Sequence, residues 1–280
     1  MSAKRILQII GLVVGFAFEF IAAHDADATV WYQALFDTAV INPNLTLSEN
    51  GVTYSIANVG NYNLPRLFKN GAYSGKSLNI SLPQSVQQSG VLDRFEYEWV
   101  RPVDPNAPHF DGVMRFFGIR FKIISAQSQP PTKGGVILTQ MWQGNPYAPA
   151  IWIDIKAPGS PGNPWPNRLW IHNGTTGQYT SDQAINLYIG TMAEDVWTLF
   201  VLGVRPGWSG NGEIEFLVNG NLVADFKGQV GYQPASQGGL PGTLDGLMIK
   251  SGAYRNSGNP PIGFAFDNMK CGSSYSDVSQ

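Results

Sequence analysis

Hydrophobic and polar residues alternate with a period of two along most of the chain after residue 28. In residues 151–156, three isoleucines occupy one set of alternate positions, and Trp152, Asp154 and Lys156 occupy the other. Because successive strand side chains point to opposite faces, this pattern predicts a strand with one apolar and one polar face. The same alternation predicts further strands over residues 94–99, 114–124 and 169–172.

Turn signals separate these segments. Two alternating runs, residues 213–218 and 221–226, flank Asn219-Gly220, and Asn-Gly in that position is a strong hairpin signal. Helical periodicity is weak, and it favours a short helical turn only near residues 181–188 and 64–70. Three Pro- and Gly-rich segments predict loops long enough to line a groove; they are residues 125–135, 157–167 and 231–243.

Many short strands without intervening helices predict an all-β fold. We expect a two-sheet antiparallel β-sandwich of the jelly-roll, concanavalin-like kind. The composition agrees, since only 14% of the 280 residues are charged while 12% are aromatic, which argues against disorder. No repeat or linker divides the chain, so residues 29–280 are expected to form a single domain.

Residues 1–28 are typical of a secretion signal peptide. Lys4 and Arg5 precede a nearly continuous apolar run that ends at Ala23, and Ala26-Asp-Ala28 offers a small-x-small cleavage site. An uncleaved membrane anchor is the alternative, because the run is near the length of about 18 residues that a spanning helix needs. We expect cleavage and a secreted protein without membrane attachment, because no later segment resembles a membrane span.

Charge and cysteine content limit the partners and cofactors. The net charge of −2 gives no general attraction to nucleic acid, so a polyanion would have to be recognised by a local basic cluster. The single cysteine, Cys271, excludes an intrachain disulfide. No His/Cys ligand cluster or Asp-rich calcium loop is present. We therefore expect a monomer that requires no cofactor, and a structural calcium ion held by loop carbonyls remains compatible with the sequence.

The segment Leu247–Arg255 predicts a strand with an unusual polar face. Lys250, Gly252 and Tyr254 lie at alternate positions and therefore share one face. Glycine lets a ligand approach the backbone closely, and the phenol beside a cation can donate and accept protons. This pattern indicates a cleft suited to chemistry on an anionic sugar chain.

Several blocks of sequence follow one another in a familiar order. Residues 197–205, the hairpin and residues 249–255 resemble the C-terminal half of polysaccharide lyases of the heparin-lyase-I and glucuronan-lyase type. The last block is also similar to the Tyr-Phe-Lys-Ala-Gly-x-Tyr block of jelly-roll alginate lyases, and Arg94-Phe-Glu96 to their Arg-x-Glu-Leu block. Gln140-Met-Trp142 stands where such lyases carry Gln-x-His. The similarity covers roughly residues 90 to 270.

The resemblance implies cleavage of an acidic, uronate-containing polysaccharide by β-elimination. Tyr254 would act as the acid and is also a candidate base. Arg94 and Gln140 would bind and neutralise the substrate carboxylate, which stabilises the charge that develops as the C5 proton leaves. Lys250 would either lower the pKa of the phenol through its charge or contact a substrate subsite.

The family's histidine is absent from its expected position, which Trp142 occupies. Either another group substitutes or activity is altered or lost. His172 lies on the same predicted face as Trp170 and is the first candidate substitute; its alternative is a hydrogen-bonded structural role. His109, in a predicted loop, is the second candidate.

Tryptophans at polar-face positions predict a platform for sugar rings, whose apolar faces suit indole. They are Trp142, Trp152 and Trp170, and Trp165 and Trp208 lie in segments predicted to be loops. Further predicted substrate contacts are Glu96, Asp154, Lys250 and Arg255.

Structural roles and other functions compete with these assignments. Arg94 could pair with Glu96 or Glu98 on a solvated face, and Tyr254 could be an edge-strand tyrosine whose hydroxyl meets water. A glycoside hydrolase on the same sandwich would need two carboxyl groups facing each other, about 5–5.5 Å apart for retention, for which Glu96, Glu98 and Asp154 are available. The replacement at Trp142 favours a non-catalytic, lectin-like carbohydrate-binding module.

Overall fold

The computed structural model of the protein describes most of the chain after residue 91 and separate strands before it. The predicted signal peptide, residues 1–28, lies outside the described residues. These are residues 30–34, 40–41, 46–49, 52–59, 66–68, 73, 75–84, 92–101, 105, 107–132, 134–158, 163–172 and 184–279.

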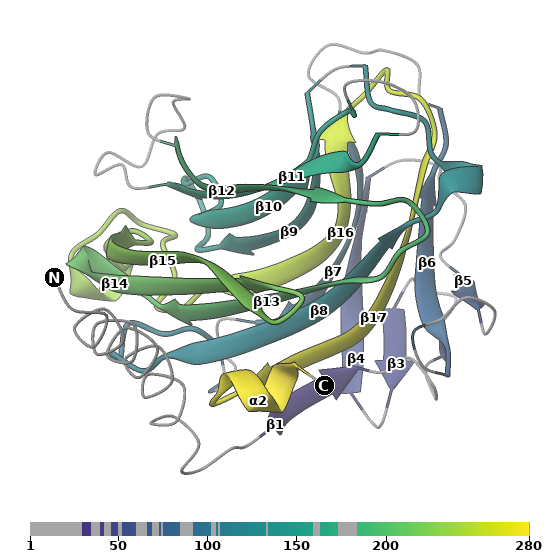
Figure 1. The fold of residues 1–280 in the computed structure, drawn as a ribbon. Helices are drawn as coiled ribbons and strands as arrows, with labels where there is room; N and C mark the ends of the chain where they lie inside the picture. The colour runs from purple at the N-terminus through teal and green to yellow at the C-terminus, as the bar shows by residue number, and fades with distance from the viewer. Residues whose placement is uncertain are drawn as a thin grey trace, which may run out of the picture.

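Two antiparallel sheets pack face to face, which confirms the predicted β-sandwich (Figure 1). Within the described ranges, one sheet has eight strands: β1 (Val30–Ala34), β5 (Arg66–Phe68), β6 (Ser77–Leu82), β8 (Arg115–Ile123), β13 (Thr198–Arg205), β14 (Gly207–Val218), β15 (Asn221–Val230) and β17 (Ile262–Gly272). The other has nine: β2 (Val40–Ile41), β3 (Thr46–Glu49), β4 (Val52–Val59), β7 (Leu92–Val100), β9 (Val136–Trp142), β10 (Ile151–Ile155), β11 (Trp165–His172), β12 (Ala184–Met192) and β16 (Met248–Asn256).

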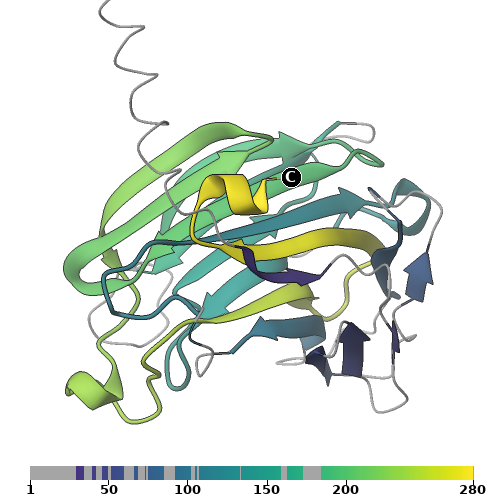
Figure 2. The ribbon, with the colours of Figure 1, turned by 90° about the horizontal axis from the view of Figure 1, so that it is seen from below.

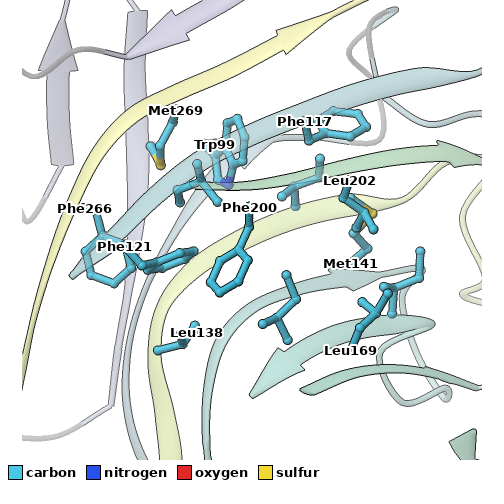
Figure 3. Packing of buried hydrophobic residues seen from close by; sticks show 14 of the residues in the cluster. Trp99, Phe117, Phe121, Leu138, Met141, Leu169, Phe200, Leu202, Phe266 and Met269 are labelled. Carbon is cyan, nitrogen blue, oxygen red and sulfur yellow. The ribbon is translucent and has the colours of Figure 1, made fainter. Parts of the chain in front are cut away.

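The core fills the space between the sheets with the apolar sides of both (Figure 3). Phe121 of β8 and Phe266 of β17 lie edge to face, with ring centroids 4.8 Å apart. Leu138 of β9 and Leu169 of β11 face them from the nine-stranded sheet and are fully buried. The predicted alternation of residues 151–155 is confirmed, because all three isoleucines of β10 are buried in this core.

The predicted hairpin is also confirmed, and the geometry of its turn explains why Asn219 and Gly220 stand there. Asn219 and Gly220 both have positive φ, 49° and 84°, as the tight turn between β14 and β15 requires. Both predicted helical turns are wrong where the structure describes them, because residues 66–68 and 184–192 form strands. Pairing of β5 with β6 and of β12 with β11 overrides a weak local preference.

The two outward-facing sides of the sandwich differ. The short helix α2 (Tyr275–Val278) packs on the eight-stranded sheet, over β8, β13 and β17 (Figure 2). The nine-stranded sheet instead bears two open cavities on its outward face. In the described part of the chain, no helix has the length and apolar character needed to cross a membrane.

Candidate active site

The central strands of the nine-stranded sheet align predicted site residues in a row. Lys250 of β16 pairs with Glu98 of β7 on one side and with Gln140 of β9 on the other. Gln140 in turn lies opposite Trp152 of β10, and Trp152 lies opposite Trp170 of β11. Five adjacent strands thus each contribute one polar or aromatic side chain to a line across the sheet.

A second row runs parallel to the first. Arg94 of β7 lies opposite Tyr254 of β16, and Tyr254 lies opposite Ile137 of β9. The row continues through Asp154 of β10 to Arg168 of β11. The strand register therefore brings Tyr254 and Arg94 together, although 160 positions separate them in the numbering.

A bulge in β9 makes these rows possible. Ile153 lies opposite Thr139 whereas Asp154 lies opposite Ile137, so β9 carries one extra residue relative to β10. As a result, Ile137 and Gln140 both line a cavity although strict alternation would place them on opposite faces. Leu138, the extra residue between Ile137 and Thr139, is buried in the core.

Two adjoining cavities form one cleft over these rows. The first has a volume of about 470 Å³ and is lined by residues that include Arg94, Gln140, Trp142, Lys250 and Tyr254. The second, of about 410 Å³, is lined by residues that include Asp154, Lys156, Arg168 and Trp170. Both are bordered by Ile137, Trp152 and Tyr254, so we treat them as one cleft with Tyr254 near its middle.

Glu96 lies beneath the floor of the cleft rather than in it. Its side chain is fully buried opposite Gly252. It accepts a hydrogen bond of 2.6 Å from Gln140 Nε2 and one from Arg94 Nε. The predicted substrate contact of Glu96 is therefore wrong, because the carboxylate is out of reach; instead it anchors Arg94 and Gln140.

Burial raises the pKa of Glu96 above its ordinary value, against the opposing effects of Arg94, Gln140 and Lys250. A raised carboxyl pKa means that the folded state keeps its proton at pH values where the unfolded state has lost it. The contribution of the protonated Glu96 side chain to the stability of the fold is then complete below the unfolded-state pKa of about 4.5. It is lost as pH rises through the pKa that Glu96 has in the folded state.

We therefore expect the stability of the wild type, relative to Glu96→Gln, to fall as pH rises from 4 to 8. The glutamine variant is the reference because it keeps the shape of the side chain and does not titrate. Free energies of unfolding in urea, measured for both proteins across this range, give the difference directly. If the wild type instead became more stable relative to Glu96→Gln as pH rises, that result would contradict the raised pKa.

The cation over the ring of Tyr254 is Arg94 and not Lys250. The Arg94 guanidinium lies 5.3 Å from the ring centroid, and the Arg94 side chain remains 25% exposed. Lys250 is directed elsewhere: its ammonium lies 3.2 Å from the Glu98 carboxylate and 4.5 Å from the Trp142 ring centroid. Of the two cations, Arg94 is therefore the one that lies next to the Tyr254 ring, and Lys250 lies toward the Trp142 end of the cleft.

The three tryptophans of the predicted platform all line the cleft, but they are not equally available. Trp152 and Trp170 lie parallel with centroids 5.8 Å apart, and Trp152 is only 8% exposed.

Asp154 forms an ion pair with Arg168, whose guanidinium lies over Trp170. Asp154 therefore holds Arg168 in place at this end of the cleft.

Two other predicted site residues, His172 and Arg255, make contacts within the protein that fit a structural role. His172 is 1% exposed, lies 2.9 Å from the Tyr232 hydroxyl and packs edge-on against Trp152; burial lowers its pKa. It does not line the cleft. Arg255 borders the second cavity, but its guanidinium donates to the carbonyls of Pro83 and Pro260.

The remaining candidates lie apart from the cleft. His109 forms an isolated bridge with Gly246 and has Nδ1 3.3 Å from the Asp245 carbonyl oxygen. Trp165 is fully buried at the start of β11 and donates to Glu194, so the predicted loop 157–167 ends earlier than expected.

The cleft residues that were not predicted include Arg168 and Tyr147. Arg168 shares the parity of Trp170 on β11, and that alternation was a usable signal. Tyr147 follows a turn after β9, and its carbonyl accepts a 2.8 Å hydrogen bond from Trp142 Nε1. Nothing in the local sequence pattern distinguishes Tyr147 from other loop tyrosines.

Solved structures that are similar to this chain include polysaccharide lyases. An endo-β-1,4-glucuronan lyase from the fungus Trichoderma reesei has a TM-score of 0.59 and 14% identity, covering 89% of this chain and 98% of that chain. The chain has the jelly-roll fold of the polysaccharide lyases. A variant of alginate lyase A1-II′ shares this lyase fold with a TM-score of 0.50 and 12% identity, over 76% and 85% of the two chains. No protein-family model and no curated protein matches the sequence.

Proposed function

We propose that the protein is a secreted polysaccharide lyase that cleaves a uronate-containing polymer by β-elimination. One observation carries the proposal: Tyr254, Arg94 and Gln140, from three neighbouring strands, line the same cleft. The lyase fold supports it, and the signal-like residues 1–28 support action outside the cell.

The first step requires neutralisation of the substrate carboxylate beside C5. Arg94 offers its partly exposed guanidinium, and Gln140 offers its side-chain amide; both are held from below by Glu96. Donors fixed before the substrate arrives stabilise the enolate-like charge without reorganising during the reaction. Lys250 adds positive charge at the Trp142 end of the cleft, where it would attract a neighbouring uronate.

The second step transfers protons through Tyr254. The tyrosine oxygen, as a phenolate beside the Arg94 guanidinium, takes the C5 proton. The electron pair of the C–H bond forms the C4–C5 double bond, and the C4–O4 bond breaks. The phenol then returns its proton to the leaving O4, which restores the phenolate. In this scheme the Tyr254 oxygen serves as both base and acid. The reaction therefore needs no histidine at position 142, where this chain has a tryptophan.

The alternatives are unequal. For a hydrolase, the available carboxylates are occupied: Glu96 is buried, Glu98 pairs with Lys250 and Asp154 pairs with Arg168. A binding module is the stronger rival, because a tryptophan at position 142 adds an aromatic surface where a lyase would carry a histidine. The product distinguishes the three.

We expect ultraviolet absorbance from C4–C5 unsaturated uronides to grow when the purified protein acts on at least one acidic polymer. A panel of glucuronan, alginate, heparin and glucuronoxylan covers the carboxylate-bearing classes. Reducing ends measured in parallel should rise in step with the absorbance. Reducing ends without absorbance would identify a hydrolase, and polymer retention without either product would identify a binding module.

A further inference from the structure

A further cavity of about 620 Å³ adjoins the cleft at Tyr147, which lines both. It lies at the beginning of β14, at the end of β15 and against the loop that follows. Its lining includes Trp208, Gln229, Tyr232, Gln233 and Leu240. We call it the neighbouring cavity.

The wall between the cleft and the neighbouring cavity is firmly built. The rings of Tyr147 and Tyr232 stack with centroids 4.1 Å apart and planes within 8°. The buried side chain of Gln143 holds the backbone of Tyr232 from both sides, accepting from its N–H and donating to its carbonyl, each at 2.7 Å. Because these side chains are already held in place, they lose little conformational entropy when a ligand binds against them.

The chemistry of the neighbouring cavity differs from that of the cleft. None of the described residues that line it carries a charged side chain, whereas the cleft has Arg94, Lys250 and Arg168. A carboxylate placed there would lose water without gaining a cation. Gln229 and Gln233 instead offer side-chain amides. Each Nε2 already donates one hydrogen bond to a backbone carbonyl, of Gly231 and Gln237 respectively, but its second N–H and the Oε1 acceptor suit hydroxyl groups.

Apolar surface completes the neighbouring cavity. Trp208 is half-buried, with Nε1 donating 2.9 Å to Gln237 Oε1, and Leu240 is 45% exposed. An indole and an aliphatic side chain beside amides match the mixed C–H and O–H surface of a pyranose ring.

We propose that the neighbouring cavity binds a neutral sugar residue. This inference rests on the proposed function insofar as it names the substrate class: a mixed polysaccharide in which neutral sugars accompany the uronates. The cleft would hold the uronate at Tyr254, and the chain would continue past Tyr147 into uncharged surroundings.

The test is binding of neutral tetrasaccharides, measured by titration calorimetry. The probes are β-1,4-linked tetramers of glucose, xylose, mannose and galactose. We expect at least one to bind the wild type, with affinity unchanged between 50 and 500 mM NaCl because no charge is involved. Trp208→Ala should weaken binding at least about tenfold, in the range that loss of an aromatic contact produces.

Two further variants keep the result interpretable. Trp197→Ala is the matched control: this half-buried tryptophan packs against Tyr73 and Lys122, away from all three cavities, and should keep tetramer affinity. Leu240→Ala removes an exposed side chain of the cavity and should weaken binding without disturbing the fold, as melting temperatures will verify.

The failures are separable. If no tetramer binds, or if Trp197→Ala weakens binding as much as Trp208→Ala, the neutral-sugar site is overturned while polyuronate cleavage is unaffected. Tighter, salt-sensitive binding of glucuronate tetramers that depends on Trp208 would also overturn it. Conversely, Trp208-dependent binding of a neutral tetramer without any unsaturated product would overturn the lyase proposal alone.

Discussion

Replacing Tyr254 by phenylalanine should lower the rate of unsaturated-product formation by about a thousandfold, the middle of the range for losing a general acid or base. The change removes one oxygen, and with it both the proposed removal of the C5 proton and the return of a proton to O4. The ring stays, so its contact with the Arg94 guanidinium and the surrounding packing are retained. The assay is initial absorbance growth on the best polymer of the panel, with circular dichroism to confirm the fold.

Tyr73→Phe is the matched control for this prediction. Tyr73 also lies under a guanidinium, with Arg120 3.7 Å from its ring centroid, but it is 48% exposed and does not line the cleft. Its replacement should leave the rate essentially unchanged. A fully active Tyr254→Phe enzyme would remove the proposed mechanism, and equal losses in both variants would show that the assay reports a general change in the protein.

Gly252→Ala should destabilise the protein by at least about 3 kcal/mol, which is large for a single methyl group. A Cβ at this position would lie 2.0 Å from the Phe95 carbonyl oxygen and 2.7 Å from Glu96 Cα. Both atoms belong to the backbone of β7, so relief requires separating two paired strands at the centre of the sheet. Urea unfolding monitored by tryptophan fluorescence gives the free energy of unfolding.

Gly210→Ala separates steric overlap from backbone strain. Gly210 has φ of +91°, and a Cβ added there would have no neighbouring atom within 4 Å. Only the cost of placing alanine at positive φ remains, about 1 kcal/mol. Equal losses at the two glycines would mean that contact with β7 does not decide the effect.

Alternation along single strands was sufficient to predict part of the site. It placed Lys250 and Tyr254 on one face of β16, and Trp152 and Asp154 on one face of β10, and the structure agrees. These predictions needed only the period of a strand: Ala253 and Ile153 enter the core, so the residues next to them face the other way.

Relations between strands could not be predicted in the same way. The partner of Tyr254 is Arg94, across the sheet, whereas the sequence offered Lys250 because it is near in the chain. The bulge in β9 likewise depends on how β9 pairs with β10 and β16. No residue pattern within β9 itself indicates it. Glu96 looked like a surface residue because it alternates with aromatics. In the structure it is buried beneath its contacts with Arg94 and Gln140, which lie on its own strand and on β9.

The carboxylate under the floor constrains any redesign of this cleft toward uncharged polymers. Exchanging Arg94 and Gln140 for apolar residues would leave the buried Glu96 carboxyl without its two hydrogen-bond donors, a loss of about 1–3 kcal/mol for an unsatisfied buried polar group. The three positions therefore have to be changed as a set. An engineer who wishes to alter specificity here has to begin one layer below the surface that touches the sugar.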